Sequence, residues 1–361
     1  MSSPTGFYKL KVDKIIRHTP DAVSVRFLVP PGVQDRFKYL AGQYLTFHLE
    51  LDGEDVRRSY SVCESPYLDA MPSVAIKEVP NGKMSTYFNR TLKEGDLVDS
   101  MPPMGKFTVV PDASFERDFV LFAGGSGITP IKSILNTILH QEPKSRITLF
   151  YANKNYESII FKTELDVLAE KHADRFKLVQ ILDEAPENWN GLSGMLNEMK
   201  VQQLMKTFVR AEKPLYFICG PGGLMEVIKT ALLQLDVEKE RINIEYFTAL
   251  KKEVDESVSV GAETVTSADI VTQTIRIDVY GDVQDVEVKP DQTILEAAQD
   301  AGMDPPFSCT VGVCTTCRAK VNSGTVFMDE REGLSDAEIE EGYVLTCQSH
   351  PTSNNVELVY E

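Results

Sequence analysis

Three cysteines stand close together in the stretch Cys309–Cys317, CTVGVCTTC, separated by four residues and then by two. The chain of 361 residues has six cysteines in all, and another, Cys347, follows in the sequence GYVLTCQSHP. The full pattern, C-x4-C-x2-C with a distant fourth cysteine, is the plant-type spacing for a [2Fe–2S] cluster. Gly312 in the loop allows the sharp turn and close backbone approach that such a cluster needs. The predicted cluster ligands are Cys309, Cys314, Cys317 and Cys347.

Two other interpretations of this cysteine cluster remain open, namely a zinc site and a set of buried core cysteines. Zinc sites usually combine two paired C-x2-C elements, whereas this chain has one such pair. The two remaining cysteines, Cys63 and Cys219, lie outside the cluster, and Cys63 is expected to be a small buried hydrophobe. The spacing therefore favours an iron–sulfur cluster over zinc.

The charge of the chain is strongly negative and unevenly distributed. The net charge of −17 argues against nucleic acid as a partner, because a phosphate backbone selects basic surfaces. From Ile270 to the C-terminus there are 17 acidic and 5 basic side chains, so the acidity is concentrated in the segment that carries the cysteines. Such acidity serves solubility, or it forms a docking surface for a basic partner.

The sequence gives no sign of a targeting or membrane-spanning segment. The first residues, MSSPTGFYKLKVDKII, lack the charged and then apolar pattern of a signal peptide. No apolar run reaches the roughly 18 residues of a spanning helix. We therefore expect a cytoplasmic protein without a membrane partner. In a reducing cytosol, clustered cysteines bind metal or carry out redox chemistry more often than they form disulfides.

The apolar pattern divides the chain into three folded segments and one linker. Short alternating strands with frequent turn residues predict an antiparallel β-barrel over 1–112. Apolar runs followed by helical stretches predict a doubly wound α/β domain with a parallel sheet over 113–249. The range 250–268 is rich in Ser, Thr, Val and acidic residues and poor in aromatic ones, so we expect a solvated linker there. Two strand-like runs, a helix and the cysteine loop predict a small α+β domain over 269–361.

Two glycine-rich turns follow apolar strands of the expected parallel sheet and precede helices. They are AGGSGITP at Ala123–Pro130 and CGPGG at Cys219–Gly223. Glycines at these places let the backbone approach a pyrophosphate, which binds at the helix N-terminus. One such turn alone is also an ordinary connection between a strand and a helix. Two of them at the strand ends of one parallel sheet line a single crevice, where ligands bind.

The expected barrel carries the sequence RRSYS at Arg57–Ser61. We expect Arg58, Tyr60 and Ser61 to alternate along one strand face, so that their side chains point the same way. A guanidinium for phosphate, a ring for stacking and a hydroxyl donor would suit a flavin nucleotide. An ordinary strand explains the same alternation equally well.

Taken together, these motifs resemble the ferredoxin–NADP reductase superfamily. RSYS at 58–61, GKMS at 82–85, GGSGITP at 124–130 and CGPGG at 219–223 follow one another in the order typical of that superfamily. The C-terminal cysteines add a fused plant-type ferredoxin, and the stretch 328–353 is similar to the reductase subunits of bacterial phenylacetyl-CoA epoxidases. The resemblance covers essentially the whole chain. It implies an FAD-binding β-barrel, an NAD(P)-binding α/β domain and a ferredoxin domain of the β-grasp type.

The resemblance implies an FAD site on the barrel. Arg58 would hold the flavin phosphate, Tyr60 would pack on the isoalloxazine ring, and Ser61 would lie near its reactive N5 atom. Lys77, in VAIKEV, would lie on the next strand of the site. The helix that begins near Gly82 would hold the FAD pyrophosphate at its N-terminus. The implied FAD-binding residues are Arg58, Ser59, Tyr60, Ser61, Lys77, Gly82, Lys83, Met84 and Ser85.

The resemblance also implies a nicotinamide dinucleotide held by Thr129 and the two glycine-rich turns. Cys219 would lie beside the nicotinamide, and Glu245, in NIEYFT, would lie near the flavin. The implied catalytic residues are Ser61, Cys219 and Glu245. The implied dinucleotide-binding residues are Gly124, Gly125, Ser126, Gly127, Thr129, Asn153, Lys154, Cys219, Gly220, Pro221, Gly222 and Gly223.

One departure from the family pattern bears on the coenzyme. Members that prefer NADPH often have arginine after asparagine at the end of the second strand of the dinucleotide domain, whereas this chain has Asn153 and Lys154. Lysine still meets a 2′-phosphate as a point charge, without the bidentate fork of arginine. We therefore expect NADPH rather than NADH as the donor.

The resemblance finally implies an enzyme that passes electrons from NADPH to FAD, then to the [2Fe–2S] cluster and then to an oxygenase. Flavin stands in the middle because nicotinamide gives two electrons as hydride, whereas the cluster accepts one at a time. The expected client is a diiron acyl-CoA epoxidase. A Rieske dioxygenase, another hydroxylase or a desaturase is the alternative client, and a redox-sensing or zinc-binding regulator without turnover is a hypothesis from a different class.

Overall fold

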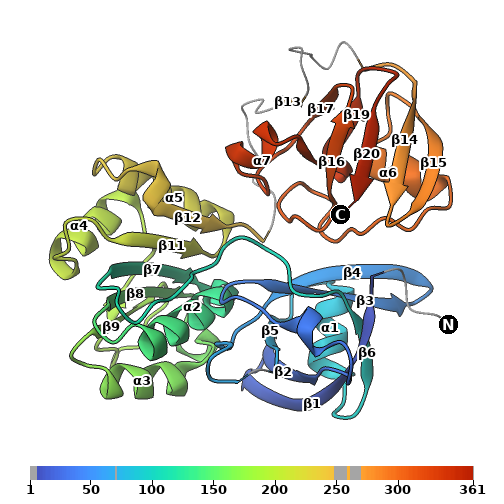
Figure 1. Cartoon of the computed structure of the whole chain (residues 1–361). Helices are drawn as coiled ribbons and strands as arrows, with labels where there is room; N and C mark the ends of the chain where they lie inside the picture. The colour runs from blue at the N-terminus through green and yellow to red at the C-terminus, as the bar shows by residue number, and fades with distance from the viewer. Residues whose placement is uncertain (1–5, 70, 248–257, 261–269, 361) are drawn as a thin grey trace. The chain divides into compact units, whose positions relative to one another are not determined.

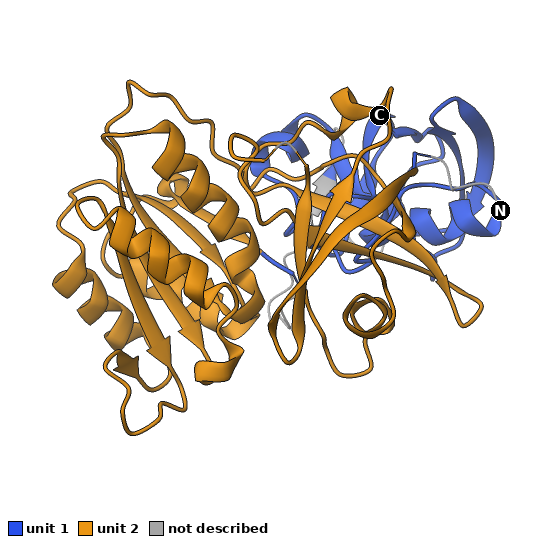
Figure 2. Ribbon diagram, turned by 90° about the horizontal axis from the view of Figure 1, so that it is seen from below, with its two compact units in different colours: residues 1–7, 246–361 blue, residues 8–245 orange. Residues whose placement is uncertain are grey.

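The computed structural model describes residues 6–69, 71–247, 258–260 and 270–360 (Figure 1). The chain forms two compact units, one spanning Tyr8–Glu245 and the other containing the residues from Tyr246 onward together with the N-terminal end (Figure 2). The larger unit holds two sheets and the smaller unit holds two more. Each unit is described by itself below.

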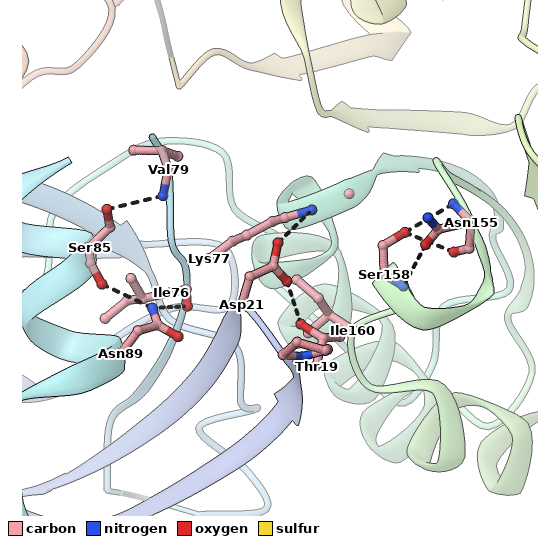
Figure 3. Close-up of polar contacts among 12 residues, drawn as sticks. Thr19, Asp21, Ile76, Lys77, Val79, Ser85, Asn89, Asn155, Ser158 and Ile160 are labelled. Carbon is pink, nitrogen blue, oxygen red and sulfur yellow. Dashed lines mark hydrogen bonds and ion pairs between the residues drawn. The ribbon is translucent and has the colours of Figure 1, made fainter. Parts of the chain in front are cut away.

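The first sheet of the larger unit is antiparallel and has the strand order β4-β3-β6-β1-β2-β5. An isolated bridge between Val62 and Val74 joins the two edge strands, so the sheet closes on itself as the predicted barrel. Helix α1 packs against β5, where the Asn89 amide donates hydrogen bonds to the carbonyl oxygens of Ile76 at 3.1 Å and Ser85 at 3.0 Å (Figure 3). The elements are β1 (Tyr8–Thr19), β2 (Ala22–Leu28), β3 (Tyr44–Leu51), β4 (Glu54–Ser61), β5 (Ser73–Lys77), α1 (Lys83–Arg90) and β6 (Leu97–Ser100).

The second sheet of the larger unit is parallel, as the alternating apolar runs predicted, with the order β10-β9-β8-β7-β11-β12. Strand β7 lies in the middle, so the chain turns one way through β8 and β9 and the other way through β11 and β12. The carboxyl ends of β7 and β11 are therefore neighbours. The elements are β7 (Asp118–Gly124), α2 (Ile128–Gln141), β8 (Arg146–Asn153), α3 (Lys162–Lys171), β9 (Phe176–Leu182), β10 (Leu192–Ser193), α4 (Glu198–Phe208), β11 (Leu215–Cys219), α5 (Gly222–Leu233) and β12 (Ile242–Glu245).

The two sheets of the larger unit share a hydrophobic core. One continuous cluster of buried side chains contains Ala22, Ala41 and Ala75 of the barrel together with Ile131 and Ile134 of helix α2. Small residues on the barrel side let the helix come close to the barrel wall. The barrel and the α/β fold are thus packed into one compact unit.

The smaller unit is a mixed α+β fold, which confirms the predicted ferredoxin-type architecture. A five-stranded sheet has the order β15-β14-β20-β16-β18, in which β14 and β20 are parallel and the other neighbours are antiparallel. A three-stranded sheet, β13-β17-β19, completes the unit. The elements are β13 (Val258–Val260), β14 (Gln273–Val279), β15 (Asp282–Val288), α6 (Ile294–Asp300), β16 (Arg318–Ser323), β17 (Val326–Met328), α7 (Asp336–Glu340), β18 (Tyr343–Leu345), β19 (Ser349–Pro351) and β20 (Glu357–Tyr360).

Strand β13 falls inside the range 250–268 that the sequence predicted as linker. It pairs antiparallel with β17, with Val260 opposite Val326, and the Val260 side chain is buried. Val258–Val260 therefore belong to the folded unit because a short valine-rich run can complete a sheet edge. The other residues of the predicted linker lie outside the described residues.

Candidate functional site

The four cysteines of the spacing pattern come together in the smaller unit. Cys317 immediately precedes β16, and Cys347 lies in the turn that follows β18. The antiparallel pairing of these two strands, with Arg318 opposite Leu345, brings the two cysteines to the same end of the sheet. Thr346 strengthens the junction, because its backbone N–H and its hydroxyl both donate to the Cys317 carbonyl oxygen, at 3.3 and 3.0 Å.

The sulfur atoms of the cluster interact directly with one another and with backbone amides. The N–H groups of Cys314 and Val311 point at the Cys309 sulfur, at 3.4 and 3.5 Å. Hydrogen bonds from the Cys314 and Cys347 thiols lower the pKa of Cys309, and a hydrogen bond from Cys347 lowers the pKa of Cys317. The same contacts raise the pKa of the two donors. The sulfurs of Cys309 and Cys317 therefore lose their protons more readily than ordinary thiols. The thiolate is the form of cysteine that binds metal.

Two glycines let the cysteine loop fold tightly. Gly312 has a φ of +77°, and a side chain there would meet Glu330 at 2.6 Å and Gln348 at 3.1 Å. Gly333 comes so close to the loop that a Cβ atom would lie 3.0 Å from the Cys314 carbonyl oxygen. The loop is thus enclosed on both sides and cannot accept larger residues at these positions.

The cysteine arrangement fits a two-iron cluster. The sulfurs of Cys309, Cys314, Cys317 and Cys347 are linked by direct contacts between Cys309 and Cys314, Cys309 and Cys347, and Cys317 and Cys347. Four thiols in the C-x4-C-x2-C spacing with a distant fourth cysteine are a ligand set that fits the two irons of a [2Fe–2S] cluster. Structural zinc sites usually combine two paired C-x2-C elements, and this loop supplies one.

The barrel strand β4 presents the RSYS motif to the surface and to helix α1. The Arg58 side chain is exposed, its guanidinium donates to the Arg57 carbonyl oxygen at 2.7 Å, and no carboxylate among the described residues forms an ion pair with it. Tyr60 lies beside Phe88 of α1, with ring centroids 5.9 Å apart, and burial raises the pKa of its phenol. Ser61 is buried. An exposed guanidinium next to a neutral aromatic ring is a donor set that fits the phosphate and ring system of a flavin nucleotide.

The first turn of α1 is wound tightly around Gly82. The Ser85 hydroxyl donates to the Gly82 carbonyl oxygen at 3.1 Å. It also accepts from the Val79 backbone N–H at 3.2 Å (Figure 3). A Cβ atom on Gly82 would lie 2.4 Å from the Ser85 hydroxyl oxygen, so only glycine fits. No side chain caps this helix, and its first turn carries no acidic residue. An uncapped N-terminus of this kind favours an anion such as a pyrophosphate.

Lys77 lies at the end of β5 and is engaged within the barrel. Its ammonium is 3.6 Å from the Asp21 carboxylate, which also accepts a hydrogen bond from the Thr19 hydroxyl at 2.7 Å (Figure 3). The predicted contact of Lys77 with the flavin stays a prediction.

The two glycine-rich turns pack backbone against backbone at the carboxyl edge of the parallel sheet. A Cβ atom on Gly127 would lie 2.2 Å from the Cys219 carbonyl oxygen, and one on Gly220 would lie 3.0 Å from the Gly124 nitrogen. In contrast, a Cβ atom on Gly125 would have no heavy atom within 4 Å, nor would one on Gly223. The turns therefore form a single edge with open space beside two of its glycines, which is where a dinucleotide backbone can approach. The other members of the predicted set at this edge are Ser126, Pro221 and Gly222.

Two side chains support the first glycine-rich turn from within the sheet and the helix. The Thr129 hydroxyl donates to the Ser126 carbonyl oxygen at 3.0 Å. Tyr151, in the middle of the sheet, donates to the Gly125 carbonyl oxygen at 3.1 Å and accepts from the Ile160 N–H at 3.3 Å. The sequence analysis missed Tyr151. The sequence feature that indicates Tyr151 is a tyrosine inside an apolar strand. A buried phenol hydroxyl needs a hydrogen-bond partner, which points to a polar contact at that place.

The end of β8 carries the two residues predicted to read the coenzyme phosphate. Asn153 is buried, and neither its side-chain oxygen nor its nitrogen meets a hydrogen-bond partner of good geometry among the described residues. Lys154 is exposed, and its ammonium lies 3.7 Å from the Glu184 carboxylate. An unsatisfied buried amide beside an exposed cation is suited to a polar ligand at this strand end.

The predicted catalytic residues Cys219 and Glu245 lie side by side at the ends of β11 and β12. Burial raises the pKa of Cys219, and the neighbouring Glu245 raises it further. Burial also raises the pKa of Glu245, to about 8. Cys219 is therefore a neutral thiol near pH 7 and not a thiolate nucleophile. Glu245, which is half-buried at the end of β12, keeps its proton to a higher pH than an ordinary carboxylic acid.

Comparisons with known proteins identify the domains that contain these candidate residues. The chain matches the oxidoreductase FAD-binding domain over residues 9–109, the oxidoreductase NAD-binding domain over 121–230 and the 2Fe-2S iron-sulfur cluster binding domain over 277–352. It is 35% identical over 358 residues to one of the subunits of 1,2-phenylacetyl-CoA epoxidase from Escherichia coli (strain K12), covering 98% of this chain and 97% of that one. The chain belongs to the family of flavin- and iron–sulfur-containing oxygenase reductases.

Further members of the family serve other oxygenases. The chain is 32% identical to the ferredoxin reductase component of 3-ketosteroid-9-alpha-monooxygenase from Rhodococcus rhodochrous, covering 97% of this chain and 96% of that one. The solved structure of phthalate dioxygenase reductase shares the fold, with a TM-score of 0.59, 23% identity and 98% of both chains covered. The protein is thus an oxidoreductase with FAD, nicotinamide-nucleotide and [2Fe–2S] domains, which sets aside the hypothesis of a regulator without turnover. No helix in the described part of the chain has the length and apolarity to span a membrane.

We expect Cys347→Ser to abolish cluster binding and to leave FAD bound, because Cys347 and strand β4, which is predicted to bind the flavin, belong to separate compact units. Iron content and the absorbance of the purified variant measure both cofactors. The variant should still pass electrons from NADPH to ferricyanide. Cys63→Ala is the control, since Cys63 lies in the larger unit. Loss of FAD together with iron in Cys347→Ser would contradict the independence of the two units.

We expect Arg58→Ala to weaken FAD binding by about tenfold to a hundredfold, because a hydrogen bond to a charged group contributes roughly 1.5–3 kcal/mol. Titration of flavin-free protein with FAD, followed by flavin fluorescence, gives the dissociation constant. The control is Arg90→Ala, which removes an exposed guanidinium at the other end of α1 that pairs with Glu78. Equal dissociation constants for wild type and Arg58→Ala would remove Arg58 from the site.

Proposed function

We propose that this protein supplies electrons from NADPH to a diiron acyl-CoA epoxidase of the phenylacetyl-CoA type. The observation that supports this client is the similarity to the Escherichia coli epoxidase subunit, which extends over all three domains at 35% identity. The relatives that serve 3-ketosteroid and glycine betaine monooxygenases, at 32% and 30% identity, support another oxygenase as the second candidate client.

The chemistry requires three cofactors in series. When bound, flavin takes two electrons together from a nicotinamide and releases them one at a time to a [2Fe–2S] cluster. The chain's own residues supply binding sites and orientation. In the proposal, Arg58 and the first turn of α1 bind the phosphates of FAD, and Tyr60 packs beside its ring. The Ser61 hydroxyl lies near the reactive edge of that ring and donates a hydrogen bond there.

The dinucleotide is proposed to lie along the edge formed by the two glycine-rich turns. The N-terminus of α2, next to Thr129, would bind the pyrophosphate, because no side chain caps that helix. Cys219 would lie beside the nicotinamide as a neutral thiol. A neutral, buried neighbour excludes water and adds no charge that would oppose the movement of a hydride. Glu245, with its raised pKa, would carry less negative charge there than an ordinary carboxylate.

NADPH is proposed as the preferred donor because Lys154 offers a positive charge at the end of β8. Glu184 opposes that preference, because its carboxylate lies beside the ammonium and competes for it. Both side chains are exposed, so the effect of either charge on binding is modest. The balance between these two residues would set the ratio of NADPH to NADH use.

We expect Lys154→Ala to raise the KM for NADPH by up to about fivefold and to leave the KM for NADH nearly unchanged, since an exposed ion pair contributes at most about 1 kcal/mol. Glu184→Gln should lower the KM for NADPH, because it frees Lys154 and removes a charge that repels phosphate. Steady-state ferricyanide reduction with each coenzyme measures both. Lys229→Ala, which breaks an exposed pair with Glu226 on α5, is the matched control. Equal effects of Lys154→Ala on both coenzymes would show that Lys154 does not contact the 2′-phosphate.

Reconstitution tests the client. The purified reductase is mixed with a diiron acyl-CoA epoxidase and, separately, with a Rieske oxygenase, and NADPH-dependent product is measured. We expect product with the epoxidase, at a rate that falls as salt rises, because attraction between the acidic C-terminal segment and a basic partner is screened over about 8 Å at physiological ionic strength. Ferricyanide reduction should change much less. Product with the Rieske oxygenase alone would overturn the proposed client, and indifference to salt would show that the acidity serves solubility.

A further inference from the structure

A lysine is buried in the middle of helix α2. Lys132 is 1% exposed, and its ammonium forms ion pairs with Glu64 at 2.5 Å and Glu164 at 3.0 Å. The ammonium also lies 3.5 Å from the Cys63 carbonyl oxygen and 4.6 Å from the centre of the Phe161 ring. A charge so deeply buried is tolerated only when paired and hydrogen-bonded, and here it has partners on every side.

The partners of Lys132 come from different parts of the larger unit. Glu64 follows β4 on the barrel, and Glu164 lies in the first turn of α3. The next residue of α2 repeats the link, because the Ser133 hydroxyl donates to the Glu64 carbonyl oxygen at 2.6 Å. One helical turn further, Thr137 shares a hydrogen bond of 2.8 Å with Ser65. The end of β4 is thus joined to α2 by a row of polar contacts, which we call the Lys132 clamp.

The surroundings of the clamp explain why polar contacts are needed there. The barrel shares a buried cluster with α2 that includes the small side chains of Ala22, Ala41 and Ala75, and a Cβ atom on Gly42 would lie 3.2 Å from the Ile134 side chain of α2. Flat apolar contacts of this kind hold two bodies together but do not fix how far one slides along the other. Ion pairs and hydrogen bonds have defined directions and distances, so they do fix that position.

The charge of the clamp is stable. Burial opposes the charged form of Lys132, but the neighbouring acidic groups raise the pKa of the ammonium above its ordinary value. Burial raises the pKa of Cys63 as well, so that thiol stays neutral. The clamp therefore remains an ammonium between two carboxylates at neutral pH.

Two residues of the clamp lie close in sequence to the two proposed cofactor sites. Glu64 is three residues beyond Ser61, the proposed flavin contact, and Lys132 is three residues beyond Thr129, which supports the proposed pyrophosphate site. Three residues is slightly less than one helical turn, so Thr129 and Lys132 lie on the same side of α2. We propose that Lys132 is a positioning residue that fixes the distance between the flavin-binding strand and the first turn of helix α2. The inference rests on the proposed function, in which a nicotinamide held by α2 meets a flavin held by β4.

This position matters because a hydride moves only between atoms held in near contact. A displacement of about 1 Å can cost about a hundredfold in rate even when the change lies far from the reacting atoms. Lys132 touches neither cofactor in the proposal, so its loss should slow the reaction without weakening coenzyme binding.

The test compares Lys132→Met with a matched control on the same helix. Glu142, at the C-terminal end of α2, is also fully buried and ion-paired, with Arg117, and accepts a hydrogen bond from Ser145 at 2.7 Å. Glu142 lies at the opposite end of α2 from Lys132, so Glu142→Gln breaks a buried pair without removing a contact of the Lys132 clamp. Thermal midpoints of the two variants show how far each is destabilised.

Two readouts separate positioning from stability. In NADPH–ferricyanide turnover, Lys132→Met should lower kcat by about tenfold, change the KM for NADPH by less than about twofold, and increase the isotope effect from NADPH deuterated at the transferred position. Hydrogen exchange without coenzyme should quicken in residues 58–65 and 126–133 of this variant. Glu142→Gln should show neither change.

Unchanged kcat, isotope effect and exchange in Lys132→Met would overturn the proposal. Should Lys132→Met fail to fold, Glu64→Gln replaces it, because Glu164 still pairs with the ammonium. The same changes, at about threefold in kcat, would then support the proposal, and their absence would overturn it. Absence of NADPH turnover in the wild type would overturn the proposed function itself, whereas normal wild-type turnover with an unaltered variant overturns only the role of Lys132.

Discussion

The pairing of β7 with β11 is the interaction on which the larger unit depends. It places two glycine-rich turns at one edge of the sheet, so close that Gly127 and Gly220 touch the opposite backbone. Helices α2 and α5 begin at that edge, and each points its N-terminus to the same side. Without this register the two turns would be ordinary loops, and no common dinucleotide edge would exist.

The features that the sequence predicted are those encoded by residues near one another in the chain. The cysteine spacing, the glycine-rich turns and the alternation of apolar runs all lie within short windows, and the fold follows them. The ion pairs of Lys132 could not be predicted, because 68 residues separate it from Glu64 and 32 separate it from Glu164. Strand β13 was missed for a different reason, since three residues in a polar stretch gain a strand conformation only from their pairing with β17.

Different kinds of interaction fix the proposed cofactor-binding segments in the two compact units. In the smaller unit, strand pairing between β16 and β18 and glycines at 312 and 333 fix the cysteine loop from all sides. In the larger unit, two sheets of different type share one core, and buried charges determine how they meet. The smaller unit therefore relies mainly on backbone pairing and backbone packing, whereas the larger unit relies on side chains from distant parts of the sequence.

The open space beside Gly223 has a consequence for the evolution of the protein. Gly127 and Gly220 cannot change without pushing the two turns apart, so they are constrained by folding itself. Gly223 has no neighbour within reach of a Cβ atom and an ordinary helical φ, so folding does not constrain it. In the proposed function, a substitution at Gly223 would therefore alter the shape presented to the coenzyme while the fold persists. Folding and coenzyme binding would then constrain separate glycines of the same edge.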